Sequence, residues 1–398
     1  MVARLQDKKA DLLKGVADRL HDKLPDPQAA MAEAFLEHYY RAVPPAELLE
    51  RDPLDLYGAA LAHLRFAEQR RPGQAKIRVY NPQLEQHGWQ STHTVVEVVS
   101  DDMPFLVDSA SMALNGHNLL IHLTIHPVIP VRRGAAGVLE AVLAPDQTQD
   151  QATLESFMHF EIDQLSDPAR LEAIHASLER VMADVRAAVE DWRGMLGKIE
   201  PALADLKRGA KALDPEEVAE VEAFLGWIAD HNFTFLGYAC YDLLREKDGD
   251  QLRRVEGSAM GLLRRQADLS PSASSRSFAA LPPEVRRLAR LPVPLIITKA
   301  NSRSTVHRPV YLDYIGVRRF DTTGMVLGEH RFLGLFTSAA YNRSPRRIPL
   351  LRRKVERIIA RANLPAASHS GKALVNIIET YPRDELFQVG DDELFETV

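Results

Sequence analysis

The sequence contains a single cysteine, Cys240, among its 398 residues. One thiol can form neither an intrachain disulfide nor a four-cysteine metal site, which fits a reducing compartment. The first residues contain no apolar signal core, and no window approaches the roughly 20 apolar residues that a membrane span needs. These absences predict a cytoplasmic protein without a membrane partner.

Nucleotide-binding loops are also absent. The 21 glycines form neither the GxGxxG string of dinucleotide-binding folds nor the GxxxxGK[ST] phosphate loop. Cys240 has no histidine or lysine near it in the sequence, which favours a buried, unreactive thiol. We therefore expect no catalytic residue, bound cofactor or metal in this chain, which is typical of a regulatory or scaffolding segment.

Positive charge is not in excess. The chain has 49 Lys and Arg against 55 Asp and Glu, a net charge of −6. One basic cluster exists, at Arg343, Arg346, Arg347, Arg352, Arg353 and Lys354. It borders an amphipathic helix and has few aromatic residues among it, so a solvated helix face is the simpler interpretation. No nucleic-acid partner is expected.

The composition, 45% hydrophobic and 26% charged, allows two or three domains with real cores. Residues 1–74 read as helices with an apolar face. Residues 75–200 then show the order strand, helix, strand, strand, strand, helix, with one long apolar strand at Leu119–Val131 and a final helix from Pro168 to about Gly197. This order predicts an α+β fold, an open antiparallel sheet with helices on one face.

A second α+β domain is expected over residues 201–364. Helices near 214–230 and 347–362 enclose four predicted strands, and the stretch 247–289 is rich in loop-forming residues with a serine-rich centre. A helix is predicted at Lys372–Glu379, before the break at Tyr381-Pro382. We interpret residues 365–398, which end in a charged tail, as a linker toward further domains downstream.

Several side chains could bind a ligand or a metal ion. Asp101 and Asp102 stand before a predicted helix, where they could cap backbone N–H groups, and the same groups suit a ligand carboxylate. His122 and His126 lie about 13 Å apart on a strand, too far for one shared zinc. His159 and the neighbouring Glu161 could approach these histidines across the sheet, although a structural pairing is the simpler interpretation.

Longer strings resemble a known family. They are Val96–Ser109 (VEVVSDDMPFLVDS), His307–Val317 (HRPVYLDYIGV), Arg331–Tyr341 (RFLGLFTSAAY), Ser344–Val355 (SPRRIPLLRRKV) and Glu379–Phe387 (ETYPRDELF). From about residue 30 to its end, the chain resembles the N-terminal region of the large bacterial NAD-specific glutamate dehydrogenases. That resemblance implies an ACT-like domain at residues 75–200, a PAS-like domain at 201–364, and a dehydrogenase domain with its NAD site far downstream.

The resemblance also implies a ligand site. ACT domains have the order βαββαβ and commonly bind amino acids where the first strand meets the first helix. The residues here that resemble this site are Asp101, Asp102, Met103, Pro104, Phe105, Leu106, Val107 and Asn118. Phe105 stands where the family usually has glycine, and its ring occupies space that a ligand would approach.

Three functions follow from this reasoning. The leading one is a regulatory and oligomerisation segment that self-associates, contacts the downstream catalytic domain and binds an amino-acid effector. The alternative is an interaction scaffold without a small-molecule ligand. A third, independent catalysis by this chain, requires NAD reduction with glutamate, which we do not expect.

Overall fold

The computed structural model describes residues 2–144, 152–209, 213–244, 251–269 and 293–398. The chain forms two compact units. Unit 1 contains Met1–Val185 and Thr305–Arg308, and unit 2 contains Arg186–Ser304 and Pro309–Val398. Both units combine antiparallel sheets with helices, which confirms the α+β class. The predicted boundaries at residues 74, 200 and 364 remain predictions.

Unit 1 begins with four helices. They are α1 (Val2–Lys23), α2 (Asp26–Arg41), α3 (Pro45–Leu49) and α4 (Pro53–Ala67). Prolines stand in the first turn of α2, α3 and α4, where a missing N–H costs nothing. The Asp52 carboxylate accepts the backbone N–H of Leu54 at 2.8 Å and so caps α4.

The first sheet follows. Its strands are β1 (Lys76–Tyr80), β2 (Thr94–Asp101), β3 (Ile121–Ile125), β4 (Val128–Arg133), β5 (Leu139–Val142) and β6 (Thr153–Ile162), and the short helix α5 (Leu84–His87) lies between β1 and β2. The strand order is β1-β2-β6-β4-β5, with β3 also paired to β6. All these pairs are antiparallel. Strand β2 thus lies between β6 and β1, and β1 precedes it in the chain. In the described residues no strand of this sheet follows β6, whereas the βαββαβ order ends with a strand after the second helix.

The long strand predicted at Leu119–Val131 is two strands. β3 and β4 both pair with β6, and the chain between them contains His126 and Pro127. Proline lacks the N–H that a ladder needs, so the pairing is interrupted there.

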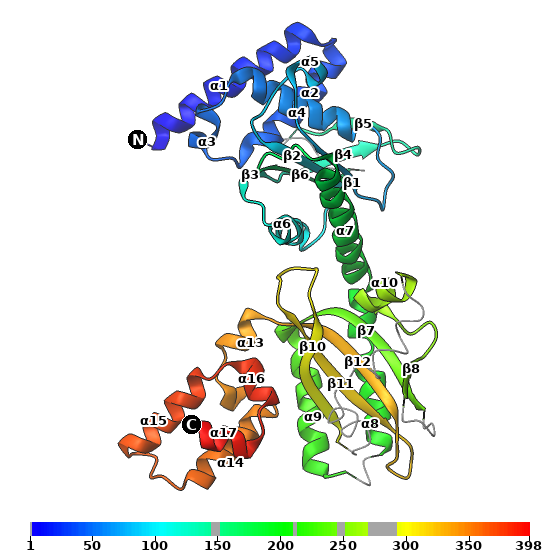
Figure 1. Cartoon of the computed structure of the whole chain (residues 1–398), viewed down its shortest axis with the longest axis vertical. Coiled ribbons are helices and arrows are strands. Elements are labelled where there is room, and N and C mark those ends of the chain that lie inside the picture. The colour runs from blue at the N-terminus through cyan, green and yellow to red at the C-terminus, as the bar shows by residue number, and fades with distance from the viewer. Residues whose placement is uncertain (1, 145–151, 210–212, 245–250, 270–292) are drawn as a thin grey trace. The chain divides into compact units, whose positions relative to one another are not determined.

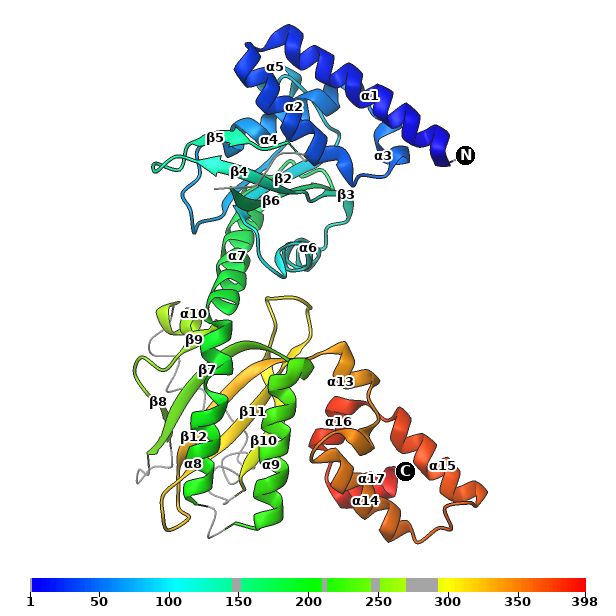
Figure 2. The same cartoon turned by 180° about the vertical axis from the view of Figure 1, so that it is seen from behind.

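Helices cover both faces of the first sheet. The predicted pair, α6 (Leu106–Gly116) and α7 (Pro168–Leu196), lies on one face, and the N-terminal helices lie on the other (Figures 1 and 2). The N-terminal helices share a hydrophobic core with the sheet. In that core the rings of Phe35 and Phe157 meet edge to face, with centroids 5.1 Å apart. Residues 1–74 therefore pack as one body with the strands.

Unit 2 contains the second sheet. Its elements are α8 (Ile199–Arg208), α9 (Pro215–Trp227), β7 (Phe233–Leu244), β8 (Gln251–Arg254), β9 (Met260–Gly261), α10 (Leu262–Leu269), β10 (Leu295–Arg303), β11 (Tyr311–Phe320) and β12 (Val326–Phe336). The order β10-β11-β12-β7-β8 places the first strand beside the last, with β9 also paired to β7. The predicted loop-rich stretch contains β8, β9 and α10, while its serine-rich centre lies outside the described residues. The PAS-like assignment remains a prediction.

The C-terminal residues are helical. They contain α13 (Ser338–Asn342), α14 (Leu351–Ala362), α15 (His369–Thr380), α16 (Arg383–Gln388) and α17 (Asp391–Thr397). Leu374, Ile378, Leu386 and Leu394 are buried in the core of unit 2. Residues 365–398, expected to be a linker, are thus largely packed helices whose apolar side chains have a common core to fill.

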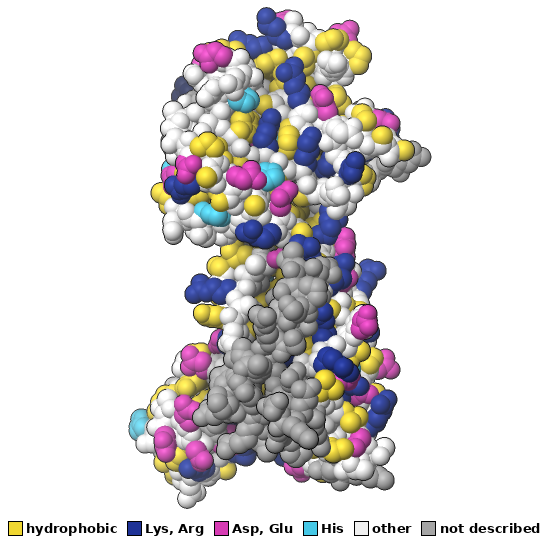
Figure 3. Space-filling view, turned by 45° about the vertical axis from the view of Figure 1, so that its right-hand side comes forward, with side chains coloured by type: hydrophobic (Ala, Val, Ile, Leu, Met, Phe, Trp, Pro, Cys, Tyr) yellow, Lys and Arg dark blue, Asp and Glu magenta, His cyan; other side chains and the backbone are white. Residues whose placement is uncertain are grey.

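The surface carries mixed charge. Basic and acidic side chains are interspersed over the face drawn in Figure 3, in keeping with the similar numbers of Lys plus Arg and Asp plus Glu. Among the described helices, none combines the length and the hydropathy needed to cross a membrane.

Candidate functional site

The predicted ligand loop begins with Asp101, which has a structural role. Asp101 ends β2, where its carboxylate accepts Arg70 Nη2 at 2.7 Å and the backbone N–H of Gly73 at 3.0 Å. Helix α6 begins only after Phe105, and no side chain caps it. The prediction that Asp101 and Asp102 cap this helix was therefore wrong, because β2 extends to Asp101 and Arg70 binds its carboxylate.

Phe105 adopts a backbone conformation that favours glycine, the residue that the resemblance leads one to expect at this position. Its φ of 73° lies in the left-handed region. Its half-buried ring is tilted by 45° to the ring of His307 in the same unit, with the ring centroids 5.0 Å apart. His307 also donates its backbone N–H to Ser109 Oγ at 3.0 Å. The phenyl ring therefore contacts protein on the surface that a ligand would otherwise approach.

The other predicted site residues are divided between two places. Asp102 and Pro104 are exposed, Met103 and Val107 are half-buried, and Leu106 is buried. Asn118, exposed with a φ of 57°, lies just beyond the opposite end of α6. An 11-residue helix is about 16 Å long. Asn118 and the loop are therefore too far apart to contact the same small ligand within one chain.

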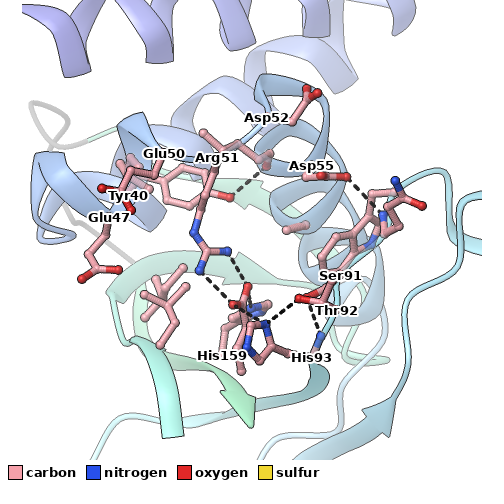
Figure 4. Close-up of a pocket in the computed structure, with 18 residues that line it drawn as sticks. Tyr40, Glu47, Glu50, Arg51, Asp52, Asp55, Ser91, Thr92, His93 and His159 are labelled. Carbon is pink, nitrogen blue, oxygen red and sulfur yellow. Dashed lines mark hydrogen bonds and ion pairs between the residues drawn. The ribbon is translucent and has the colours of Figure 1, made fainter. Parts of the chain in front are cut away.

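A cavity of about 560 Å³ lies elsewhere in unit 1, between α3, α4, the chain before β2, and strands β3 and β6 (Figure 4). This volume is in the range of small-molecule pockets. Its lining residues are Tyr40, Glu47, Leu48, Glu50, Arg51, Asp52, Asp55, Leu56, Ala59, Trp89, Gln90, Ser91, Thr92, His93, Leu123, Ile125, His159 and Glu161.

The cavity has groups of both charges. Glu47, Glu50 and Asp52 are exposed carboxylates at its helical side. Arg51 extends from the same turn toward the sheet, where it donates two hydrogen bonds to Glu161, at 2.6 and 2.8 Å. His93 Nδ1 lies 3.6 Å from the Glu161 carboxylate. The polar groups thus lie on both sides of a partly apolar cavity, as in sites for small polar ligands.

Burial and charge shift the pKa values at the cavity floor. Burial alone would raise the pKa of Glu161, but the His159 imidazole and the Arg51 guanidinium lower it to about 2. Burial would lower the pKa of His159, but the Glu161 and Glu97 carboxylates raise it. Burial also lowers the pKa of His63 to about 4. The neutral His63 and the charged Glu161 are therefore the forms present near neutral pH.

A group able to bind a metal lies behind the cavity. His63, Glu97 and His159 come from α4, β2 and β6, and one nitrogen or oxygen from each lies within 4.8 Å of the others. We did not identify His63 or Glu97 from the sequence. A signal existed for Glu97, since it is the one charged residue in the run of buried valines from Val95 to Val99.

The candidate polar cluster of His122, His126, His159 and Glu161 does not form, and structural pairing, the simpler interpretation, holds for His122 and His126. His122 binds Asp163 at 2.9 Å, and His126 binds Ser156 Oγ at 2.7 Å. The reason is the alternation of side chains along β3, because Leu123 and Ile125 are the residues that stand opposite Glu161 and His159.

Half of the basic cluster of unit 2 is bound by other groups of the protein, while Arg343, Arg346 and Arg347 are exposed. Arg352 binds Glu220 at 2.6 Å, Arg353 binds Glu216, and Lys354 donates to the carbonyls of Leu386 and Val389. An open cavity of about 570 Å³ is lined by Asn342, Arg343, Ser344, Arg346, Arg347 and Glu379.

Cys240 is half-buried, and burial raises the pKa of its thiol.

Comparisons with known proteins cover both units. Residues 35–178 match the family described as glutamate dehydrogenase, ACT1 domain, and residues 348–398 match glutamate dehydrogenase, helical motif 1. A NAD-specific glutamate dehydrogenase of Halomonas elongata is 39% identical over 393 residues, which are 98% of this chain and 24% of that protein. One from Pseudomonas aeruginosa is 38% identical over 389 residues, again 98% and 24%.

A more distant relative, from Mycobacterium tuberculosis, is 27% identical over 338 residues, 84% of this chain and 19% of that protein. The chain thus spans about a quarter of the length of the relatives from Halomonas elongata and Pseudomonas aeruginosa.

Proposed function

Because this chain belongs to the NAD-specific glutamate dehydrogenase family, matching such proteins over 98% of its length, we propose that it is the N-terminal regulatory and oligomerisation region of such an enzyme. The whole enzyme would convert L-glutamate and NAD to 2-oxoglutarate and ammonia. NAD would bind in the part of the enzyme that this chain does not cover. The match of residues 35–178 to an ACT1 domain is the observation that carries the proposal.

The regulatory role consists of binding an amino-acid effector in unit 1. The cavity of about 560 Å³ supports this, because carboxylates such as Glu47 suit an ammonium group and hydroxyls such as those of Ser91 and Thr92 suit a carboxylate. The loop from Asp101 to Val107 is the second location, supported by its resemblance to ACT ligand loops. An effector would shift the catalytic equilibrium by a coupling free energy of about 1–3 kcal/mol.

Calorimetry tests effector binding directly. The chain is titrated with each of the common amino acids up to millimolar concentration, in a buffer that contains a metal chelator. We expect at least one to bind. If none binds while the chain still self-associates, the scaffold function replaces the regulatory one.

Two variants distinguish between the cavity and the loop as the effector site. Glu47→Gln removes an exposed carboxylate of the cavity, and Asp102→Asn removes the exposed carboxylate of the loop. We expect Glu47→Gln to weaken binding and Asp102→Asn to leave it unchanged. Glu37→Gln, at an exposed position of α2 outside the cavity lining, is the matched control. Weakening by Asp102→Asn alone would place the effector in the loop.

Self-association is proposed to use the edge of the first sheet. Strand β1 is an end of the strand order and pairs with β2 on one side. An open edge can accept a strand of a second copy. Sedimentation velocity over a range of chain concentrations should show a reversible dimer or larger oligomer; a monomer at every concentration would contradict this part.

The chain alone is expected to be inactive. Incubation with glutamate and NAD should give no formation of NADH above background, measured by absorbance. Turnover by the chain would overturn the proposal that the catalytic residues lie outside it.

A further inference from the structure

Three buried side chains meet at the centre of unit 1, although they are far apart in the sequence. His63 and Glu97 have no exposed surface, and His159 is 1% exposed. The Nδ1 atom of His159 lies 3.8 Å from Oε1 of Glu97, longer than a hydrogen bond. Two imidazoles and a carboxylate thus share a small volume inside the protein without direct hydrogen bonds that connect all three.

One nitrogen of each imidazole has no partner. His63 Nε2 and His159 Nδ1 are buried and make no hydrogen bond. Leaving a buried polar atom unpaired costs about 1–3 kcal/mol, and such atoms in folded proteins call for an explanation, an ion among them. The two atoms belong to the same three-residue group, so one ligand can satisfy both.

The remaining polar atoms of the group face partners outside it. Tyr39 OH lies 3.1 Å from His63 Nδ1, and Tyr80 OH donates to Glu97 Oε1 at 3.2 Å. His159 Nε2 faces Glu161 at 3.8 Å. In metal sites, the second nitrogen of a ligating histidine is usually held by a carboxylate or another polar group, which fixes the orientation of the ring. Here the Tyr39 hydroxyl orients the ring of His63 by a hydrogen bond, whereas the Glu161 carboxylate lies near the ring of His159 as an ion-pair contact.

We propose that His63, Glu97 and His159 bind a divalent transition-metal ion of the zinc class, through His63 Nε2, His159 Nδ1 and the Glu97 carboxylate. Two imidazoles and one carboxylate suit zinc, whereas calcium and magnesium prefer oxygen ligands alone. Zinc–ligand distances near 2.1 Å place tetrahedral ligand atoms about 3.4 Å apart. His159 Nδ1 and Glu97 Oε1 are 3.8 Å apart, and all three ligand atoms lie within 4.8 Å of one another, so metal binding would draw the side chains together by up to about 1.4 Å.

His159 is the one member of the group that lines the cavity of about 560 Å³, so a metal ion would reach the group from that side. The fourth ligand of a tetrahedral zinc would be a water molecule. Charge limits the affinity. Arg78 binds Glu97 through Nε at 3.0 Å, and its positive charge opposes the metal. The metal must also displace the proton that the Glu97 and Glu161 carboxylates favour on His159.

Metal titration of the whole chain tests the proposal. The chain, freed of metal by chelator and dialysis, is titrated with Zn²⁺ and with Co²⁺. We expect about one ion per chain, visible absorption typical of tetrahedral Co²⁺, and a rise in melting temperature that a chelator reverses. If the chain binds no stoichiometric Zn²⁺, the proposal is overturned.

A surface histidine pair supplies the control. The rings of His93 and His122 lie 4.5 Å apart beside Asp163, and His122 and Asp163 are each 39% exposed, so this pair can bind zinc adventitiously. We expect His63→Gln to weaken Zn²⁺ binding at least about tenfold and His122→Gln to leave it unchanged. Loss of binding in His122→Gln alone would show surface binding only and overturn the proposal.

A milder variant covers the case in which His63→Gln does not fold. Tyr39→Phe keeps the ring and removes the hydroxyl that orients His63. We expect it to weaken Zn²⁺ binding about tenfold with the fold retained, as seen by circular dichroism. Unchanged affinity in Tyr39→Phe would contradict the assigned ligand atoms. These measurements contain no amino acid, so their outcome is independent of effector binding.

Discussion

Phe105 combines two opposing effects at one residue. Its left-handed backbone, φ 73°, costs about 1–2 kcal/mol for a residue with a side chain, and its ring packs 5.0 Å from His307. Phe105→Ala keeps the strain and loses the ring, whereas Phe105→Gly loses both. We therefore expect the glycine variant to be more stable than the alanine variant by about 1 kcal/mol, measured by urea unfolding. Equal stability of the two variants would show that the backbone is not strained.

Glu161 is a buried carboxylate whose stabilising effect depends on pH. It is 3% exposed and paired with Arg51, which is 30% exposed. Glu161→Gln leaves the guanidinium without its carboxylate, so we expect a loss of about 2 kcal/mol at pH 7, less than for a fully buried pair. Unfolding of both proteins in urea at pH 7 measures the difference.

The sign of the pH dependence follows from the lowered pKa of Glu161. The folded pKa is about 2 and the ordinary value is 4.5, so the carboxylate stabilises the fold above pH 4.5. This contribution is lost as the pH falls from 4.5 toward 2. The difference between wild type and Glu161→Gln should therefore shrink over that interval. A difference that stays constant down to pH 2.5 would mean that ionisation of Glu161 does not stabilise unit 1.

At the scale of the elements, α4 packs tightly against the segment that precedes β2. A methyl group at Gly58 would overlap Trp89 Cβ, and Trp89 is 2% exposed, with little room to move. Although alanine favours a helix by about 1 kcal/mol over glycine, the displacement of Trp89 should dominate. We expect Gly58→Ala to destabilise unit 1 by about 2 kcal/mol, measured by urea unfolding.

Gly15 in α1 is the matched control. A methyl group there meets no atom within 4 Å, so Gly15→Ala should stabilise the chain by about 0.5–1 kcal/mol through helix propensity alone. If both alanine variants are more stable than the wild type, the contact between α4 and Trp89 is looser than described.

The elements differ in how well their sequences predict them. The helix predicted from Pro168 to about Gly197 is α7, which ends at Leu196, because its apolar periodicity is long and its start is marked by proline. The strand predicted at Leu119–Val131 was wrong as one element, because hydrophobicity alone does not show that Pro127 interrupts the pairing.

At the scale of the whole molecule, two cores stabilise two units. The core of unit 1 and that of unit 2 consist of separate sets of residues. We expect calorimetry to resolve two thermal transitions, and Glu161→Gln to lower one of them by about 5 °C and leave the other unchanged. A single transition that shifts as a whole would show that the units unfold together.

The sequence by itself determined the α+β class, most helices and strands, and the family resemblance, because these depend on local periodicity and on long strings of residues. The position of the candidate sites was not accessible in this way. Asp101 binds Arg70, 31 positions earlier, and Asn118 lies at the far end of α6 from the predicted loop.

Only the tertiary structure brought His63, Glu97 and His159 together. They come from one helix and two neighbouring strands, and their proximity depends on strand register and on how α4 packs over the sheet. Periodicity predicts which face of an element is buried, but it does not predict which buried faces meet. The chemistry of this unit therefore depends on contacts between distant parts of the chain.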